Sequence, residues 1–215
     1  MHLGLNFERA LTYALHVHGG HVRKGTEVPY FSHLMAVSAT VIENGGSEDE
    51  AIAALLHDAV EDQGGQPRLN DIRDRFGVDV GDIVEACSDS LDSATGEPKK
   101  DWLERKRKYL HDLPNKSGAI LRVSVADKLH NSRAIYRDAK SGGKQFWERF
   151  SRPGDPNTVD RTIAYYSALY SIFRNVHQTP VTAELGDAVA ALHTLVEDKT
   201  VHDRLVEQLM SRQSH

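Results

Sequence analysis

Residues 54–62 read Ala-Leu-Leu-His-Asp-Ala-Val-Glu-Asp, and they place one histidine and three carboxylates within two turns of a predicted helix. Residues four apart share a helical face, so His57 is predicted beside Glu61, and Asp58 beside Asp62. Clustering four ionisable groups on an otherwise apolar helix costs stability unless the groups are paired or bind a metal. The pattern therefore indicates a functional site rather than a packing face.

The helix that carries this stretch is predicted to span residues 47–62. Ser47 followed by Glu50 makes a capping box, in which each side chain accepts a hydrogen bond from a backbone N–H group that the first helical turn leaves unpaired. Apolar residues recur at helical spacing behind the polar edge, namely Ile52, Leu55, Leu56, Ala59 and Val60.

The rest of the chain has the same helical periodicity. Between Gly and Pro breaks, apolar residues return with a period of about 3.6, and sustained alternation typical of strands is absent from the sequence. We therefore predict an all-α fold, a compact bundle of helices with the site in its centre. The other predicted helices span residues 6–18, 32–43, 70–76, 80–90, 102–113, 119–138, 158–176, 182–197 and 201–211, with a break at Gly142-Gly143.

Composition limits the classes of function. With 215 residues, 40% of them hydrophobic, and a net charge of -5, the chain fits one soluble compact domain or a domain with small appendages. A pI near 6.2 argues against a broad nucleic-acid-binding surface, although a small phosphate ligand needs only a local basic pocket. We expect no export signal and no membrane span, because an apolar run of about 18 residues is absent from the sequence. The single cysteine, Cys87, excludes an intrachain disulfide and fits reducing cytoplasm.

Further metal-ligand types occur in two other segments. In Ala-Asp-Lys-Leu-His-Asn, Asp127 and Asn131 are four apart and share a helical face, and His33 stands at the start of a predicted helix. Taken singly, His33 would be read as a capping residue, and Asp127 as half of a solvated ion pair with the lysine beside it. Together with His57 and Asp58 they make a set of imidazoles and carboxylates that suits Mn²⁺, Fe²⁺ or Co²⁺ with open positions.

Three motifs in this order resemble the HD superfamily of metal-dependent phosphohydrolases, and within it the hydrolase domain of the RelA/SpoT proteins. The motifs are Arg-Lys-Gly through Pro-Tyr-Phe-Ser-His at residues 23–33, His-Asp-Ala-Val-Glu-Asp at residues 57–62, and Ala-Asp-Lys-Leu-His-Asn at residues 126–131. The resemblance runs from about Tyr13 to about Phe173. Because it extends to no synthetase or regulatory region, the chain is most similar to the stand-alone small alarmone hydrolases.

The resemblance implies an activity and a domain plan. The activity is Mn²⁺-dependent hydrolysis of the 3′-pyrophosphate of (p)ppGpp-type alarmones to GDP or GTP and pyrophosphate. The partner is therefore expected to be a small-molecule nucleotide in the cytoplasm, with no nucleic acid and no membrane. Residues 1–177 would form the HD phosphohydrolase domain, and residues 178–215 a helical extension that packs on it or mediates a homodimer.

Carried over residue by residue, the resemblance also implies roles. The Mn²⁺ ligands would be His33, His57, Asp58 and Asp127. Glu61 and Asp62 match the acidic pair that orients or deprotonates the attacking water, and the motif leaves open which of them is the base. The residues implied to contact the nucleotide are Arg23, Lys24, Asn131, Arg161 and Tyr165.

Two rival functions stay open. The same site could act on another nucleotide, such as ppApp or a nucleoside 5′-monophosphate. Alternatively, the chain could be a catalytically silent nucleotide-binding module. The presence of Glu61 and Asp62 beside all four ligands favours an enzyme, because a module that only binds has no chemical need for two extra carboxylates.

Overall fold

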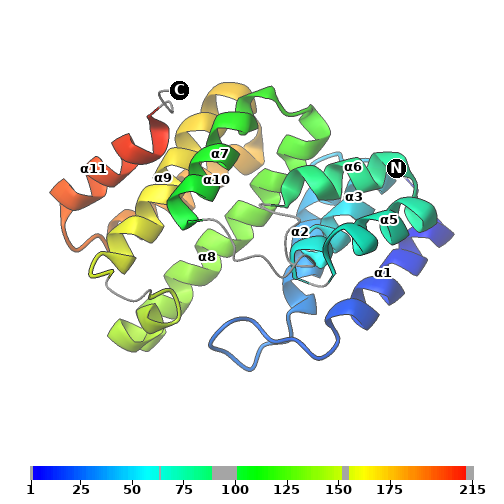
Figure 1. Cartoon of the computed structure of the whole chain (residues 1–215), viewed down its shortest axis with the longest axis horizontal. Coiled ribbons are helices and arrows are strands. Elements are labelled where there is room, and N and C mark those ends of the chain that lie inside the picture. Colours follow the sequence, from blue (N-terminus) through cyan, green and yellow to red (C-terminus); the bar gives the residue numbers. More distant parts are fainter. Residues whose placement is uncertain (1, 63, 89–100, 152–154, 212–215) are drawn as a thin grey trace. The chain divides into compact units, whose positions relative to one another are not determined.

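The computed structural model describes residues 2–62, 64–88, 101–151 and 155–211, except for the side chain of Asp62. Within these ranges the regular secondary structure is helical (Figure 1). The only β-type pairing there is an isolated antiparallel bridge between Val22 and Pro29. The predicted all-α fold is confirmed. Among the described helices, none combines the length and the apolar composition needed to cross a bilayer.

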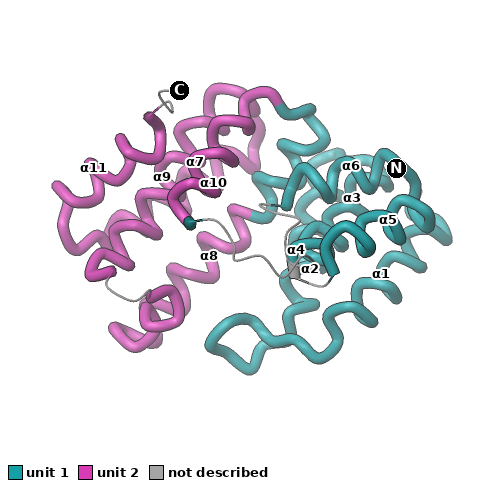
Figure 2. The backbone as a smooth tube through the Cα atoms, viewed as in Figure 1, with its two compact units in different colours: residues 1–101, 116–127 teal, residues 102–115, 128–215 magenta. Residues whose placement is uncertain are grey.

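Contacts between residues divide the chain into two compact units, which are coloured separately in Figure 2. Unit 1 consists of Met1–Asp101 and Lys116–Asp127, and unit 2 of Trp102–Asn115 and Lys128–His215. Helix α8 (Gly118–Glu148) contributes residues to both. The domain boundary at residue 177 stays a prediction.

Unit 1 is organised around one buried helix, α3 (Glu48–Leu56). It packs against α1 (Leu5–His18), α2 (Phe31–Glu43) and α6 (Val78–Cys87), and every residue from Glu50 to its end is buried. The remaining helices of the unit are α4 (Ala59–Asp62), α5 (Gly65–Phe76) and the first part of α8. Whatever follows α3 in the chain is thus placed by the most enclosed helix of the unit.

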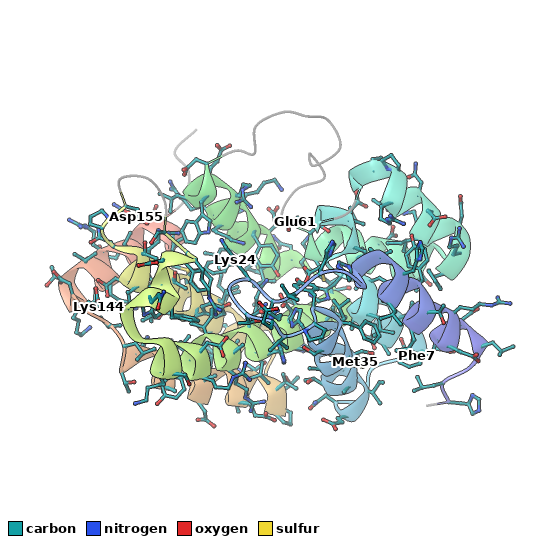
Figure 3. All side chains as sticks on the ribbon, turned by 90° about the horizontal axis from the view of Figure 1, so that it is seen from below. Phe7, Lys24, Met35, Glu61, Lys144 and Asp155 are labelled. Carbon is teal, nitrogen blue, oxygen red and sulfur yellow. The ribbon has the colours of Figure 1, made fainter. Side chains whose placement is uncertain are left out.

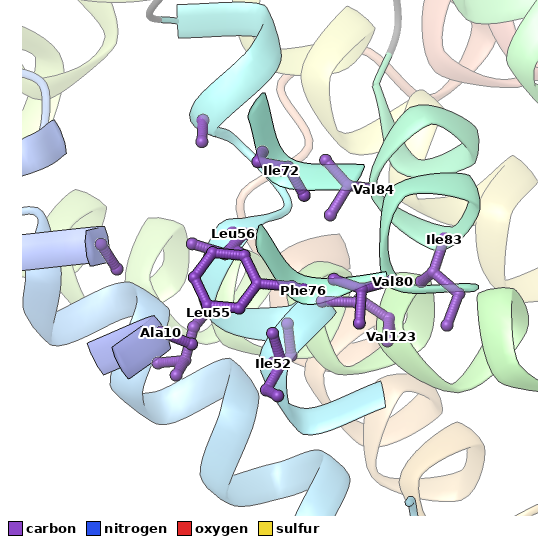
Figure 4. Packing of buried hydrophobic residues seen from close by; sticks show 14 of the residues in the cluster. Ala10, Ile52, Leu55, Leu56, Ile72, Phe76, Val80, Ile83, Val84 and Val123 are labelled. Atoms are coloured by element: carbon purple, nitrogen blue, oxygen red, sulfur yellow. The ribbon is translucent and has the colours of Figure 1, made fainter. Parts of the chain in front are cut away.

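The apolar faces of these helices make a common core. Phe7 of α1 packs partly buried against it, whereas Met35 on the outer face of α2 is 46% exposed (Figure 3). In the centre, the ring of Phe76 from α5 lies among side chains of α3 and α6 (Figure 4). These neighbours include Ile52, Leu55, Leu56 and Val80.

The start of α3 is held by the predicted capping box. The backbone N–H of Glu50 donates to Ser47 Oγ at 3.2 Å, and the backbone N–H of Ser47 donates to Glu50 Oε2 at 2.5 Å. The guanidinium of Arg122 in α8 donates to the other oxygen of the Glu50 carboxylate. This buried carboxylate therefore ties α3 to the segment of α8 that carries Asp127.

The single helix predicted over residues 47–62 is wrong at its centre, because His57 and Asp58 form a turn between α3 and α4. Nδ1 of His57 lies 2.8 Å from the carbonyl oxygen of Ala54. A carbonyl can only accept, so Nδ1 carries the proton and donates. In an uninterrupted helix that carbonyl would accept from the backbone N–H of Asp58, and the imidazole competes for it. The predicted stacking of His57 over Glu61 on one regular helix therefore does not apply.

Unit 2 is organised around α9 (Thr158–Val176), against which α10 (Pro180–His193) and α11 (Lys199–Met210) pack. It also contains α7 (Trp102–Asp112), the short 3₁₀ helix η2 (Leu113–Asn115) and the rest of α8. The buried carboxylate of Asp160 in α9 accepts from the backbone N–H groups of Glu197, at 2.9 Å, and Asp198, at 3.3 Å. This contact holds the start of α11 against α9.

The other helices lie close to the predicted ranges, with three notable differences. Helix α5 begins at Gly65 rather than at residue 70, and α8 continues beyond residue 138 to Glu148. Helix α10 ends at His193 rather than at residue 197. The predicted break at Gly142-Gly143 is a kink, because Gly143 has φ +55° and ψ -141° inside α8. The end of the helix predicted over residues 80–90 lies outside the described residues, and α6 ends at Cys87.

Replacement of Leu55 by alanine should lower the free energy of unfolding by about 2 to 5 kcal/mol, because it deletes a fully buried side chain of the central helix. Leu5→Ala is the matched control, since Leu5 is 70% exposed and should change stability by less than about 0.5 kcal/mol. Urea denaturation of both variants measures the difference. Equal losses in the two variants would contradict the assignment of this core.

Candidate metal centre

Four side chains from three segments of unit 1 converge. His33 lies in the first turn of α2, His57 and Asp58 in the turn after α3, and Asp127 in α8. Nε2 of His57 lies 3.0 Å from Oδ2 of Asp58 and 3.6 Å from Oδ1 of Asp127. Nε2 of His33 lies 3.6 Å and 3.3 Å from the same two oxygens. The structure thus brings together all four residues predicted as ligands.

The donor atoms of this cluster fit a divalent cation. His57 is buried, and its Nε2 has no hydrogen-bond partner among the described residues. Because Nδ1 donates to Ala54, Nε2 presents a lone pair to the carboxylate oxygens of Asp58 and Asp127. A lone pair and two anionic oxygens repel one another unless a positive charge lies between them. Ligand atoms of His33, His57 and Asp58 lie within 4.8 Å of one another, a spacing that one ion could span.

The electrostatics of the cluster also favour added positive charge. Burial alone would lower the pKa of His57, but the facing carboxylates of Asp58 and Asp127 outweigh it and raise that pKa well above its ordinary value. Burial alone would raise the pKa of Asp58, but His57 and His33 outweigh it and hold that pKa well below its ordinary value. The surroundings therefore keep Asp58 anionic and favour positive charge at His57.

Glu61 and Asp62, the predicted catalytic pair, follow directly in α4. Glu61 is half-buried in unit 1 and is labelled in Figure 3. Asp62 ends α4, and its side chain lies outside the described part of the chain. The structure thus places Glu61 on the helix that begins one residue after the His57-Asp58 turn, and the catalytic role of both carboxylates stays a prediction.

Arg23 and Lys24 lie on the loop between α1 and α2, where Figure 3 labels Lys24. The backbone N–H of Arg23 donates to the carbonyl of Val28 at 2.7 Å, and that of Tyr30 donates to the carbonyl of His21 at 2.8 Å. The guanidinium of Arg23 lies 5.6 Å from the centroid of the Tyr30 ring. These contacts close the loop and hold the predicted nucleotide-binding pair on it.

Three further residues predicted to contact the nucleotide lie in unit 2. Asn131 belongs to the part of α8 within that unit, and Arg161 and Tyr165 are one turn apart on α9. Nε of Arg161 donates to the Asp155 carboxylate at 2.5 Å, and its guanidinium lies 4.6 Å from the centroid of the Trp102 ring. Tyr165 meets the same ring edge to face at 5.8 Å. Contact of these residues with a nucleotide stays a prediction.

Two residues near Asp58 receive no functional role from the sequence. The hydroxyl of Tyr30 donates to Oδ2 of Asp58. His18, which is 1% exposed at the end of α1, stacks on the Tyr30 ring with centroids 5.3 Å apart and planes 24° apart. Tyr30 stands inside the motif around residues 23–33, but only the tertiary contact separates it from an ordinary packing residue.

The chain is similar in sequence to known proteins. The family model described as the HD domain matches residues 10–149. The guanosine-3′,5′-bis(diphosphate) 3′-pyrophosphohydrolase MESH1 of Xenopus tropicalis is 36% identical over 136 residues, which cover 62% of this chain and 71% of that protein. The GTP pyrophosphokinase rsh of Brucella ovis is 32% identical over 127 residues, which cover 59% of this chain and 16% of that protein.

A solved structure supports the fold independently. It is described as a metazoan ortholog of SpoT that hydrolyzes ppGpp, and it matches with a TM-score of 0.69 over 88% of this chain and 97% of that chain. The two sequences are 23% identical, so this likeness concerns the fold alone.

His18 should make the protein less stable in mild acid. Burial lowers the pKa of His18 to about 4, whereas an unfolded histidine titrates near pH 6.5. Between these pH values the unfolded chain binds a proton that the folded chain does not, so stability falls as the pH falls. The free energy of unfolding falls by about 1.4 kcal/mol per pH unit in this range. His18→Phe should therefore remove about 2 to 3 kcal/mol of the stability that the wild type loses between pH 7 and pH 4.5.

Urea denaturation at the two pH values measures this difference. His16→Phe is the control, because His16 is an exposed residue of the same helix and should leave the pH dependence as in the wild type. Parallel pH profiles for the wild type and His18→Phe would show that His18 is not responsible.

Proposed function

The chain belongs to the HD-domain family, and on that premise we propose that it is a metal-dependent hydrolase of the 3′-pyrophosphate of (p)ppGpp-type alarmones. The products are GDP or GTP and pyrophosphate. The observation that carries the proposal is the convergence of His33, His57, Asp58 and Asp127 within 3.0 to 3.6 Å across the cluster. The substrate class is supported by the relatives named 3′-pyrophosphohydrolase, which this chain matches over most of their length.

We assign Mn²⁺ to this cluster, with Co²⁺ or Fe²⁺ as substitutes that the same donor types accept. A divalent cation, when bound, polarises the phosphoryl group and lowers the pKa of a water molecule. The chain prepares for it by fixing a tautomer: the hydrogen bond from Nδ1 of His57 to Ala54 leaves Nε2 as the donor atom. Asp58 and Asp127 supply the negative charge that favours the ion.

Glu61 and Asp62 are assigned to the attacking water. In the reaction, a water oxygen bonds to the phosphorus attached to the 3′ oxygen, the bond between that phosphorus and the 3′ oxygen breaks, and the 3′ oxygen gains a proton. A carboxylate within hydrogen-bond reach of the water takes up the proton that the water loses. The position of α4 directly after the ligand turn supports Glu61 and Asp62 as that carboxylate pair.

Arg23 and Lys24 are assigned to the nucleotide. The flat guanidinium of Arg23 suits stacking on a purine, and the ammonium of Lys24 suits a phosphate. Asn131, in the motif at residues 126–131, is assigned to the nucleoside. Arg161 and Tyr165, in Asp-Arg-Thr-Ile-Ala-Tyr-Tyr at residues 160–166, are assigned to the phosphates because the family has an Arg and a Tyr there.

The purified chain with Mn²⁺ should convert ppGpp to GDP and pyrophosphate, and EDTA should abolish the reaction. Incubation with ppGpp, ppApp and GMP in parallel, followed by anion-exchange chromatography, identifies the products. Orthophosphate from GMP without cleavage of ppGpp would instead indicate a nucleoside monophosphatase. Cleavage of ppApp alone would mean that the chain catalyses the same reaction on an adenosine alarmone rather than on a guanosine alarmone.

Glu61→Gln and Asp62→Asn should each lower kcat by about 100-fold or more while the Mn²⁺ content stays near that of the wild type, because general-base catalysis contributes about 10² to 10⁴ in rate. The exposed Glu43 in α2 of the same unit provides the control variant Glu43→Gln, which should retain full activity. Steady-state kinetics gives kcat of each variant, and metal analysis gives its Mn²⁺ content. Wild-type turnover in both variants would refute the assigned role.

A further inference from the structure

We propose that Tyr30 is a positioning residue that couples the metal centre to the loop carrying Arg23 and Lys24. The inference rests on the proposed function in one respect, because it treats Asp58 as a metal ligand and the loop as part of the nucleotide site. Tyr30 contacts Asp58 through its hydroxyl, and the loop through its backbone and its ring. It therefore links the metal-ligand cluster to the loop.

Asp58 is the ligand that most needs support. Its side chain is 25% exposed, compared with 0% for His33, 2% for His57 and 9% for Asp127. Packing thus fixes three of the ligands and leaves the Asp58 carboxylate the freest to rotate. The hydrogen bond from Tyr30 selects one orientation, and partners of this kind typically decide how well a ligand is preorganised.

The oxygen that Tyr30 contacts is the one that faces the cluster. Oδ2 of Asp58 accepts from the Tyr30 hydroxyl and is also the oxygen 3.0 Å from Nε2 of His57 and 3.6 Å from Nε2 of His33. A carboxylate oxygen can accept at two positions, so one remains for a cation when the other accepts from the phenol. The hydroxyl therefore supports the ligand atom without replacing the ion.

The Tyr30 ring is itself held from several sides. The buried His18 stacks on one face, and the edge of His33 meets the ring at 5.6 Å with planes 70° apart. Arg23 lies over the ring at 5.6 Å. These contacts on the ring accompany the hydrogen bond from its hydroxyl to Asp58.

The backbone of Tyr30 connects the same residue to the loop and to α2. Its N–H closes the loop by donating to His21, and its carbonyl accepts from the N–H of His33 at 2.9 Å. A shift of Tyr30 therefore displaces Asp58, the start of α2 and the end of the loop together. If metal binding fixes Tyr30, it also favours one loop conformation, and by linkage the nucleotide must strengthen metal binding by the same factor.

Tyr30→Phe isolates the hydroxyl, because phenylalanine keeps the ring and its stacking. The chain offers a matched control in Tyr13, whose hydroxyl donates to Oδ2 of Asp71 at 2.5 Å in the same unit. Tyr13→Phe removes the same kind of bond from a carboxylate that is not part of the cluster. His57→Ala, which deletes a proposed ligand, identifies the cluster as the place where the ion binds.

Isothermal titration with Mn²⁺ alone should show about 10- to 100-fold weaker binding to Tyr30→Phe than to the wild type, with Tyr13→Phe unchanged. Equal affinities of Tyr30→Phe and the wild type would overturn the proposal. The titration needs no turnover, so a chain that binds Mn²⁺ but leaves ppGpp intact would refute the proposed function and not this inference. A wild type that binds no Mn²⁺ would refute both.

Coupling is measured with GDP as the probe. The wild type should bind GDP more tightly with Mn²⁺ than without it, and the gain should disappear in Tyr30→Phe and persist in Tyr13→Phe. GDP binding without Mn²⁺ should be the same in all three proteins, which excludes general damage to the loop. A Mn²⁺-dependent gain in GDP affinity of wild-type size in Tyr30→Phe would refute the coupling.

In turnover, excess Mn²⁺ should restore kcat of Tyr30→Phe, whereas a misfolded site would not recover.

Discussion

The hydrogen bond from Nδ1 of His57 to the carbonyl of Ala54 determines how the rest of the site is arranged. It lies where α3 ends and the chain turns at His57 and Asp58. It also fixes the tautomer and directs Nε2 at the two carboxylates. Since α3 is enclosed by α1, α2 and α6, the end of this helix, and with it His57, has a defined position in the unit.

A cluster of two imidazoles and two carboxylates in a core needs a reason to persist. Removing an ion from water costs several kcal/mol even after the protein relaxes, and the attraction between paired groups offsets this cost only when geometry is good. In this cluster both imidazole nitrogens face both carboxylates, and the pKa of His57 rises while that of Asp58 falls. The arrangement therefore favours positive charge at its centre, which is compatible with a bound cation.

The parts of this molecule that sequence could predict are those encoded within a few residues. The capping box of Ser47 and Glu50 and the helical periodicity are local, and they hold in the structure. The break at His57-Asp58 was not predictable from periodicity, because a polar pair on the exposed edge of a helix has the same pattern whether or not the helix continues. Tyr30 is a different case, since its contact with Asp58 joins residues 28 positions apart and no spacing rule covers such a pair.

The exposure of Asp58 follows from what a hydrolytic site requires. Catalytic metal sites keep an open position for water and substrate, so at least one side of the ion cannot be sealed by packed side chains. Of the four predicted ligands Asp58 is the least buried, so its side of the cluster is the one that packed side chains cover least. The same residue must be open and yet hold its orientation, and packing cannot meet both needs. A directional hydrogen bond from Tyr30 meets both needs, because it restrains the carboxylate from one direction and leaves the other directions free.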